Sequence, residues 1–403
     1  MSKVLEQYTK WVYPIPVEDM RAAIENGSYN EIGDPFQWWP MFWPNKRDAD
    51  KLDILVAGCG SVQAAYYACR NPNWSVLGID ISETSLAHHN KLKKTHKLSN
   101  LTLKKLNISD IESLGQSFDF IICTGVLHHL PEPDVGLLAL KNVLRAEGVM
   151  NLMVYGMSLR LGVYIMQEAF RLLDFKQTQE DVDIVKATVS SLAPDHIVKK
   201  YVNNAPDLHY DAAYVDTFLH PQDRAYSVKE VFEFTRRAGL EFLSWADPLP
   251  YCLEAAVPAH HPLCRKIQNL PDELAAHICD LLVQDRGTHR WSAAHPQYIN
   301  KIQIPFETEA LFDCIVFIHS GANLMRSSDF KTTGKIYLKR GNREIEIEPG
   351  IANVLEKSSL HTKIRDIFVS LNLTPDQQEK LKARLREVFK SLWKEGHIHI
   401  LLP

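Results

Sequence analysis

The sequence predicts an α/β protein with a doubly wound, Rossmann-like sheet of seven strands, and three observations support this fold class. Across residues 51–155, short apolar runs alternate with helical segments, which is typical of a parallel sheet with crossover helices. The first run ends in a turn with two glycines, Gly58 and Gly60, which let a ligand approach the backbone closely. The second run ends in Asp80, placed as the carboxylate that accepts from ribose hydroxyls in nucleotide-binding folds. The sequence therefore predicts a nucleoside-cofactor site at the carboxyl edge of the sheet.

Composition limits the classes of function. The 403 residues are 45% hydrophobic and 23% charged, as expected of a folded protein with roughly two to three domains. The formal net charge of -4 gives no electrostatic reason to expect a nucleic acid or an anionic membrane as partner. Seven cysteines without a CxxC pair indicate reduced thiols. With no apolar signal core and no apolar run long enough to cross a bilayer, we expect a cytoplasmic protein without a membrane span.

Residues 1–50 form an aromatic, proline-rich N-terminal arm. Four of the eight tryptophans lie here: Trp11, Trp38, Trp39 and Trp43. An isolated surface segment would not expose that much aromatic area. We therefore expect the arm to pack over the sheet domain and to close the cofactor or substrate cleft, with plain aromatic packing as the alternative.

Residues 51–257 form the predicted sheet domain. Its first half is expected to hold strands at 53–57, 75–80, 101–105, 118–124 and 149–155, and helices at 62–70, 82–97 and 134–144. The run 118–124 is too apolar for a half-exposed strand, as in a parallel sheet covered on both faces. Residues 156–225 are mainly helical, and we expect this insertion to form a lid over the cleft.

After the lid, a helix should begin at Ser227, since Glu230 three residues later completes a capping box. Closing strands are expected at 240–245 and 251–257. Residues 258–300 are predicted to be a helical linker. Residues 301–403 are predicted to be a small α+β accessory domain of winged-helix-like form, with strands at 315–318, 334–339, 344–347 and 396–400 and a helix capped by Thr374.

The ordered motifs Val56–Gly60, Gly78–Ser82, Phe118–Ile121 and Gly125–Leu130 resemble those of class I S-adenosylmethionine-dependent methyltransferases. The resemblance covers residues 50–160 and extends to 225–257. The stretch 216–226, together with Tyr8 and the pair Tyr13-Pro14, is similar to the methyltransferase domain of bacterial tetratricopeptide-repeat methyltransferases. The alternative, a dinucleotide-binding dehydrogenase, usually has a third glycine, where this chain has Val62 and Gln63. The resemblance implies S-adenosyl-L-methionine as cofactor and S-adenosyl-L-homocysteine as product.

The resemblance also implies cofactor-binding residues. Gly58, Gly60 and Gln63 would contact the amino-acid part, Asp80 the ribose hydroxyls, and Ile81 the adenine.

Two further strand ends complete the implied cofactor site. Asn107, with Ile108 beside it, would accept from the adenine amino group where the family often has an acidic residue, and Asp110 is the alternative. The end of the fourth strand would contact the methionine portion through Cys123, Thr124 and Gly125.

Histidines are frequent, and we expect no metal site among them. His128 and His129 are adjacent and diverge on a helix, and the sequence indicates no third ligand. The pair commonly starts the turn after the fourth strand in the family, so a structural role is favoured over catalysis. The remaining histidines and cysteines lack metal-ligand spacing.

The stretch 216–226 is the other dense group of functional side chains. His220 and Asp223 are the candidates for catalysis or substrate binding, and a salt-bridged loop anchor is the alternative. The substrate-binding candidates are Tyr13, His129, Tyr155, Arg224 and Tyr226.

The predicted function is methyl transfer by in-line displacement to an oxygen or nitrogen acceptor on a small molecule or on a protein or peptide. The alternative is a non-catalytic sensor or interaction protein that binds the cofactor or its product. We expect no nucleic-acid partner and no membrane partner, and the sequence leaves a homodimer open.

Overall fold

The computed structural model describes the whole chain apart from residues 1–2, 14–15, 47–48, 206, 259 and 328–333. Its contacts divide the chain into two compact units. The first unit comprises Met1–Asp34, Asp50–Ala246 and Asp280–Pro296, and the second comprises Pro35–Ala49, Asp247–Cys279 and Gln297–Pro403. In the described residues, no helix has the length and apolarity needed to cross a membrane.

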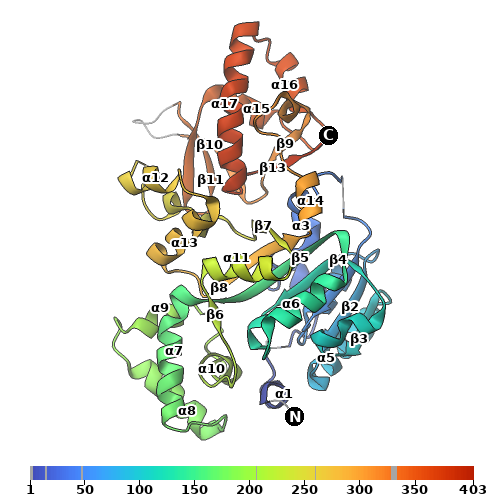
Figure 1. Cartoon of the computed structure of the whole chain (residues 1–403), viewed down its shortest axis with the longest axis vertical. Helices are drawn as coiled ribbons and strands as arrows, with labels where there is room; N and C mark the ends of the chain where they lie inside the picture. The colour runs from blue at the N-terminus through green and yellow to red at the C-terminus, as the bar shows by residue number, and fades with distance from the viewer. Residues whose placement is uncertain (1–2, 14–15, 47–48, 206, 259, 328–333) are drawn as a thin grey trace. The chain divides into compact units, whose positions relative to one another are not determined.

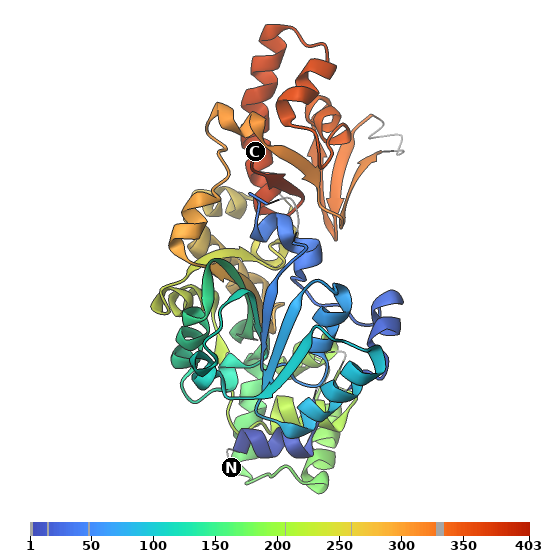
Figure 2. The same cartoon turned by 90° about the vertical axis from the view of Figure 1, so that its right-hand side faces the viewer.

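An eight-stranded sheet forms the centre of the first unit (Figure 2), with the strand order β3-β2-β1-β4-β5-β8-β7 and β6 paired to β5. The strands are β1 (Asp53–Ala57), β2 (Ser75–Asp80), β3 (Leu101–Lys105), β4 (Phe118–Thr124), β5 (Leu144–Gly156), β6 (Ala225–Tyr226), β7 (Glu241–Trp245) and β8 (Thr288–Ala294). Strands β1 to β6 pair in parallel, whereas β8 runs antiparallel between β5 and β7. The predicted α/β class and mostly parallel sheet are confirmed, but the sheet has eight strands and not the predicted seven, because the two-residue strand β6 also pairs with β5.

Helices cover both faces of this sheet (Figure 2). They are α4 (Gln63–Arg70), α5 (Glu83–His96), α6 (Pro133–Asn142) and α11 (Val228–Arg237). Local sequence sets where they begin, because the Ser82 side chain accepts from the backbone of Ser85, and Ser227 and Glu230 form the predicted capping box. Buried on both faces, β4 is apolar throughout its centre.

One predicted strand is wrong. Residues 251–257 hold two short 3₁₀ turns, η3 (Leu249–Tyr251) and η4 (Leu253–Ala255), and the strand beside β5 is β8, inside the segment predicted to be a helical linker. The sequence of β8 begins with Thr288, His289 and Arg290, which hides its strand character. Its burial comes from lying between two neighbours in the sheet, since Trp291 and Ala293 are fully buried there.

The N-terminal arm is divided between the two units. Its first part, with α1 (Lys3–Lys10) and α2 (Met20–Glu25), belongs to the first unit. Its tryptophan-rich part, with α3 (Pro35–Phe42), belongs to the second unit, where it contacts β13 (Ile398–Leu401) and where Tyr298 donates a hydrogen bond to the carbonyl of Phe42. Phe42 and Trp43 of this second part are therefore core packing, whereas Phe36 is exposed.

The lid lies between β5 and β6 and has a small core of its own (Figure 1, lower part, green). Its helices are α7 (Met157–Leu172), α8 (Gln179–Ser191), α9 (Ile197–Asn203) and α10 (Asp211–Phe218). Their facing apolar side chains include Val163, Phe170, Val185 and Phe218, and Trp11 and Tyr13 of the arm pack against this cluster.

The second unit is α+β. A sheet of β10 (Ala322–Arg326), β11 (Ile336–Arg340) and β12 (Arg343–Ile347) and a pair of β9 (Ile315–Ile318) and β13 share a core with helices. The helices of this core are α15 (Pro349–Glu356), α16 (Ile364–Ser370) and α17 (Pro375–Lys394). The second unit also holds α14 (Pro296–Lys301), α12 (Pro262–Ile267) and α13 (Asp272–Val283), which continues into the first unit, and α12 and α13 share a small apolar cluster. A capping box of Thr374 and Gln377 starts α17.

Candidate active site

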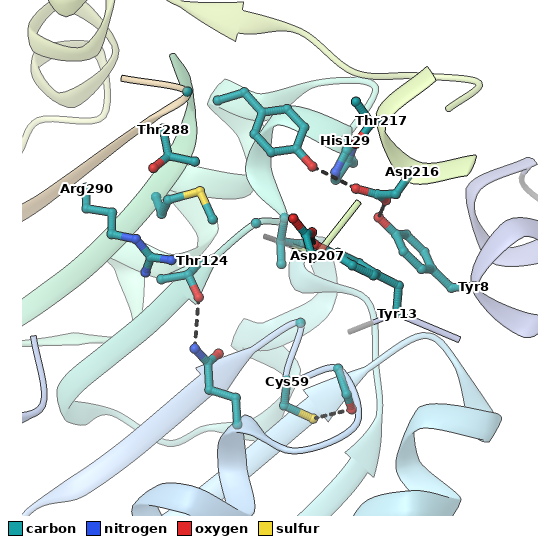
Figure 3. A pocket seen from close by; sticks show the side chains of 18 of the residues that line it. Tyr8, Tyr13, Cys59, Thr124, His129, Asp207, Asp216, Thr217, Thr288 and Arg290 are labelled. Atoms are coloured by element: carbon teal, nitrogen blue, oxygen red, sulfur yellow. Dashed lines mark hydrogen bonds between the residues drawn. The ribbon is translucent and has the colours of Figure 1, made fainter. Parts of the chain in front are cut away.

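The first unit encloses a cavity of about 770 Å³ at the carboxyl ends of its parallel strands. Four parts of the chain supply the walls: the N-terminal segment, the strand ends with their turns, the lid and the start of β8. Figure 3 shows side chains from these parts pointing into one space. Segments almost 300 residues apart in the sequence, such as Val4 and Arg290, thus contribute to one site.

The glycine turn after β1 forms the floor of the cavity. Gly58 and Gly60 have φ values of +70° and +57°, which L side chains rarely adopt. A Cβ on Gly58 would lie 2.4 Å from Cγ2 of Val126, so no larger residue fits there. The backbone of the turn therefore lies bare at the cavity, as close approach to a ligand requires.

Asp80 is the last residue of β2 and lies beside this turn. Its Oδ2 accepts from the backbone of Gly60 at 2.9 Å and its Oδ1 from that of Ser82 at 2.8 Å. Burial raises the pKa of Asp80, and these backbone donors oppose the rise. Each carboxylate oxygen keeps a lone pair for a second donor, which suits the two vicinal hydroxyls of a ribose.

The predicted adenine-binding residues line the cavity next to Asp80: Ile81, Asn107 and Ile108. Asn107 caps the following 3₁₀ helix, its oxygen accepting from the backbone of Ser109 at 3.2 Å, and a second lone pair remains. Asp110, the alternative, is not among the described lining residues. The geometry favours Asn107, and the adenine contact itself stays a prediction.

On the other side of the glycine turn lies a polar group that joins three segments. Gln63 donates through Nε2 to Glu31 at 3.0 Å and to the hydroxyl oxygen of Thr124 at 2.9 Å. Glu31 also accepts from the Tyr29 hydroxyl at 2.6 Å. Arg290 of β8 lines the same region (Figure 3). Gln63 and Thr124 were predicted, whereas Glu31 and Arg290 were not, because no motif marks them.

Cys123 and Gly125, the two other residues predicted at the end of β4, differ in whether they line the cavity. Gly125 lines the cavity. Cys123 has no exposed surface and is not among the described lining residues, because alternate side chains of a strand point to opposite faces and this one points into the sheet packing.

A carboxylate held by two phenols forms the far wall. Asp216 of α10 is 3% exposed and accepts from the hydroxyls of Tyr8 and Tyr155, both at 2.8 Å (Figure 3). Burial works to raise the pKa of Asp216, but the facing imidazoles and the phenols lower it, and the net direction is downward. Beside this wall, Tyr13 donates to Asp207 of the lid. Tyr13 and Tyr155 were predicted as substrate-binding residues.

His129 lines the cavity, and the ring of His220 stacks on it at 4.0 Å between centroids. The ring nitrogen Nδ1 of His129 donates to the carbonyl of Gln222 at 3.1 Å, so Nε2 of the neutral ring is unprotonated and carries a lone pair. Nδ1 of His220 accepts from the backbone of Gln222 at 3.0 Å, so its Nε2 carries the proton. Burial lowers the pKa of both rings, that of His220 to about 3, and both are neutral at pH 7.

His129, Asp216 and His220 bring one ligand atom each within 4.8 Å of one another, a grouping of metal-ligand types that the sequence spacing did not reveal. The tautomer of His220 opposes metal binding, since the backbone of Gln222 fixes a proton on the free nitrogen. The carboxylate is already held by its phenol donors. The hydrogen bonds of His220 and Asp216 therefore favour a proton-holding hydrogen-bond network over a metal site.

The other residues of the stretch 216–226 are not brought to the described cavity wall. Asp223 pairs with Arg160 at 3.4 Å and accepts from Gln167 at 3.3 Å, which is the loop-anchor alternative. His220 lies behind His129. Arg224 pairs with Glu230 and stacks over the buried ring of Tyr226, outside the described lining.

Comparison with known proteins finds a family match for part of the chain. Residues 55–150 match a family model described as a methyltransferase domain. A protein of Synechococcus sp., described as uncharacterized, is 31% identical over 250 residues, which are 58% of this chain and 58% of that protein. The ubiquinone biosynthesis O-methyltransferase of Neisseria meningitidis is 26% identical over 97 residues, 24% of this chain and 41% of the relative. The match thus spans 58% of the length of the first curated relative and 41% of that of the second.

A solved structure, PKMT2 from Rickettsia typhi, is similar over most of the chain. The TM-score is 0.61 at 16% identity, and the match covers 92% of this chain and 76% of that one. The same protein in complex with AdoHcy gives a TM-score of 0.60. At this identity the likeness shows the fold alone. The family match over residues 55–150 and the shared fold agree with the predicted resemblance of the ordered motifs to the class I S-adenosylmethionine-dependent methyltransferases.

Proposed function

We propose that the protein transfers a methyl group from S-adenosylmethionine to a nitrogen or oxygen nucleophile on a small molecule or a peptide, and that a basic amine is the acceptor its site fits best. The observation that carries this proposal is the wall of Asp216, Tyr8 and Tyr155, which shares one cavity with the glycine turn and Asp80.

The cofactor fits the residues present. The turn of Gly58 and Gly60 lines the cavity, Asp80 has free lone pairs for a ribose, and Asn107 has one for adenine. When bound, S-adenosylmethionine supplies a methyl group on a positively charged sulfur, which leaves as the neutral thioether.

The wall suits a cation. The hydroxyl protons of Tyr8 and Tyr155 are both directed to Asp216, so the phenol oxygens present lone pairs to the cavity. Carboxylates outnumber guanidinium groups by five to three among the described lining residues: Glu31, Asp80, Asp207, Asp216 and Asp285 against Arg160, Arg286 and Arg290. The cofactor carries one net positive charge, so one negative charge of the lining remains to be balanced by a cationic acceptor.

His129 completes the chemistry. An amine must lose its proton to attack, and Nε2 of the neutral His129 ring holds a lone pair at the cavity. With the cofactor bound, this nitrogen would take the proton of the amine first, and the freed lone pair of the amine would then displace the neutral thioether from the methyl carbon. The enclosing lid and arm exclude water, so that alignment contributes much of the rate.

A labelled-methyl assay on amines, phenols and carboxylates, and on lysate fractions separated by size, tests the proposal. With the best amine, Asp216→Asn should lower kcat/KM by at least about tenfold, since one charged hydrogen bond contributes about 1.5–3 kcal/mol. Its affinity for S-adenosylhomocysteine should stay within about threefold of the wild type, because errors of additivity for separate contacts are about 0.3–0.5 kcal/mol.

Transfer only to phenols or carboxylates would overturn the amine acceptor. Binding of the cofactor without transfer to any fraction would favour the non-catalytic sensor instead.

A further inference from the structure

A carboxylate and a guanidinium face the same part of the cavity without bonding to each other. Glu31 comes from the N-terminal segment and Arg290 from β8, and both line the cavity beside Gln63 and Thr124. Each feels the electrostatic field of the other, since Arg290 is one of the groups that lower the pKa of Glu31. Among the described residues, no ion pair joins them.

Glu31 is held firmly at this place. Beyond its bonds from Tyr29 and Gln63, the backbone next to it is tied to the sheet: Nδ2 of Asn151, on β5, donates to the carbonyl of Ile32 at 2.9 Å. A Cβ on Gly33 would lie 2.3 Å from that same amide nitrogen. The carboxylate is thus positioned by tethers, and it is 9% exposed.

Arg290 is placed opposite Met153 of β5, which also lines the cavity. Figure 3 shows its guanidinium directed toward Thr124. In the part of the chain that the structure describes, no hydrogen bond or ion pair from the protein satisfies this guanidinium. A half-buried cation of this kind is costly unless a ligand pairs with it.

We propose that Glu31 and Arg290 form a charge clamp for the amino-acid part of the cofactor, with Glu31 receiving its α-ammonium group and Arg290 its α-carboxylate. This inference rests on the proposed function. It adds two residues, from the two ends of the first unit's sequence, to a subsite where the sequence indicated only the glycine turn, Gln63 and the end of β4.

The neighbouring polar atoms complete the clamp. Nε2 of Gln63 is occupied by its two bonds, which leaves Oε1 to accept from the ammonium group. Because the oxygen of Thr124 accepts from Gln63, its own proton is free to be donated to the carboxylate. Donors and acceptors therefore match a zwitterion, and a guanidinium binds a carboxylate bidentately.

Isothermal titration of the full chain with two ligands tests the clamp. S-adenosylhomocysteine carries the amino-acid part, and 5′-methylthioadenosine lacks it. The wild type should bind the first more tightly than the second. Arg290→Ala should weaken the affinity for S-adenosylhomocysteine by about 10- to 100-fold, as expected for a lost charge-assisted hydrogen bond. It should leave the affinity for 5′-methylthioadenosine unchanged.

Arg145→Ala is the matched control. Arg145 pairs with Asp53 and Asp119 at the amino edge of the sheet, so this change should leave the ratio of the two affinities unaltered. Arg290→Lys and Glu31→Gln keep most of the side-chain volume. If Arg290→Ala also fails to bind 5′-methylthioadenosine, Arg290→Lys and Glu31→Gln test the clamp instead. The quantity compared is again the ratio of the affinities for S-adenosylhomocysteine and 5′-methylthioadenosine.

The outcomes separate the two proposals. An unchanged ratio in the Arg290 and Glu31 variants, with a wild type that binds both ligands, overturns the clamp and leaves the proposed function standing. Equal affinity of the wild type for both ligands also overturns it. A wild type that binds neither ligand overturns the proposed function.

Discussion

At the scale of residues, the polar side chains of the site are oriented by one set of hydrogen bonds and keep further donors or acceptors free for a ligand. Asp80 is held by two backbone donors and keeps a lone pair on each oxygen. Gln63 uses its amide protons on Glu31 and Thr124 and keeps its oxygen free. Such preorganisation lowers the entropic cost of ordering side chains when a ligand binds.

The charge of Glu31 has a cost that can be measured. Burial raises its pKa above the usual 4.5, although the bonds from Tyr29 and Gln63 and the field of Arg290 oppose the rise. The unfolded chain then binds fewer protons than the folded one, so the free energy of unfolding falls as pH rises from 4.5 through the raised pKa. At pH 7, Glu31→Gln should therefore raise the melting temperature of the unliganded protein.

The same substitution should reduce the further rise in melting temperature that S-adenosylhomocysteine produces, because the ligand's ammonium loses its counter-charge. Calorimetric melting curves with and without the ligand measure both effects. Equal melting temperatures for wild type and Glu31→Gln, with equal ligand shifts, would contradict this account of Glu31.

At the scale of elements, helix α1 and the lid form the acceptor wall together. Tyr8 and Gln7 of α1 both donate to Asp216 of α10. The arm and the lid are thus joined by bonds to one buried carboxylate, and neither element alone makes the wall.

Removal of residues 1–10 should consequently lower methyl transfer to an amine by at least about tenfold, because Asp216 loses two of its donors and the wall opens to water. Affinity for S-adenosylhomocysteine should change little, since the cofactor groups discussed above lie elsewhere in the cavity. Thr9→Ala is the control, as the Thr9 hydroxyl bonds only within the exposed side of the helix to Leu5. Unaltered turnover after the deletion would show that α1 is not part of the acceptor site.

At the scale of the whole molecule, local patterns predicted the first unit well and distant pairings poorly. The glycine turn, Asp80, the capping box at Ser227 and the cap at Thr374 depend on neighbours in sequence, and the structure has the turn, the box and the cap as expected. Strand β8 was missed, since its strand character depends on packing between β5 and β7.

Long-range contacts also set the parts of the site that sequence reasoning missed. Glu31 and Arg290 meet through the fold, and Asp216, absent from the predicted site residues, becomes an acceptor wall only when Tyr8 and Tyr155 reach it. Conversely, His220 and Asp223 stood out in sequence through their chemical types, but their side chains are turned to internal partners.

Titration calorimetry with S-adenosylhomocysteine on the wild type and on Asp80→Ala tests the central claim most directly. The account predicts that the wild type binds one molecule and that Asp80→Ala abolishes binding, because Asp80 both accepts from the ribose and fixes the glycine turn through Gly60. Arg145→Ala, at the amino edge of the sheet, should bind as the wild type does. No binding by the wild type, or an affinity unchanged by Asp80→Ala, would contradict the assignment of this cavity as the cofactor site.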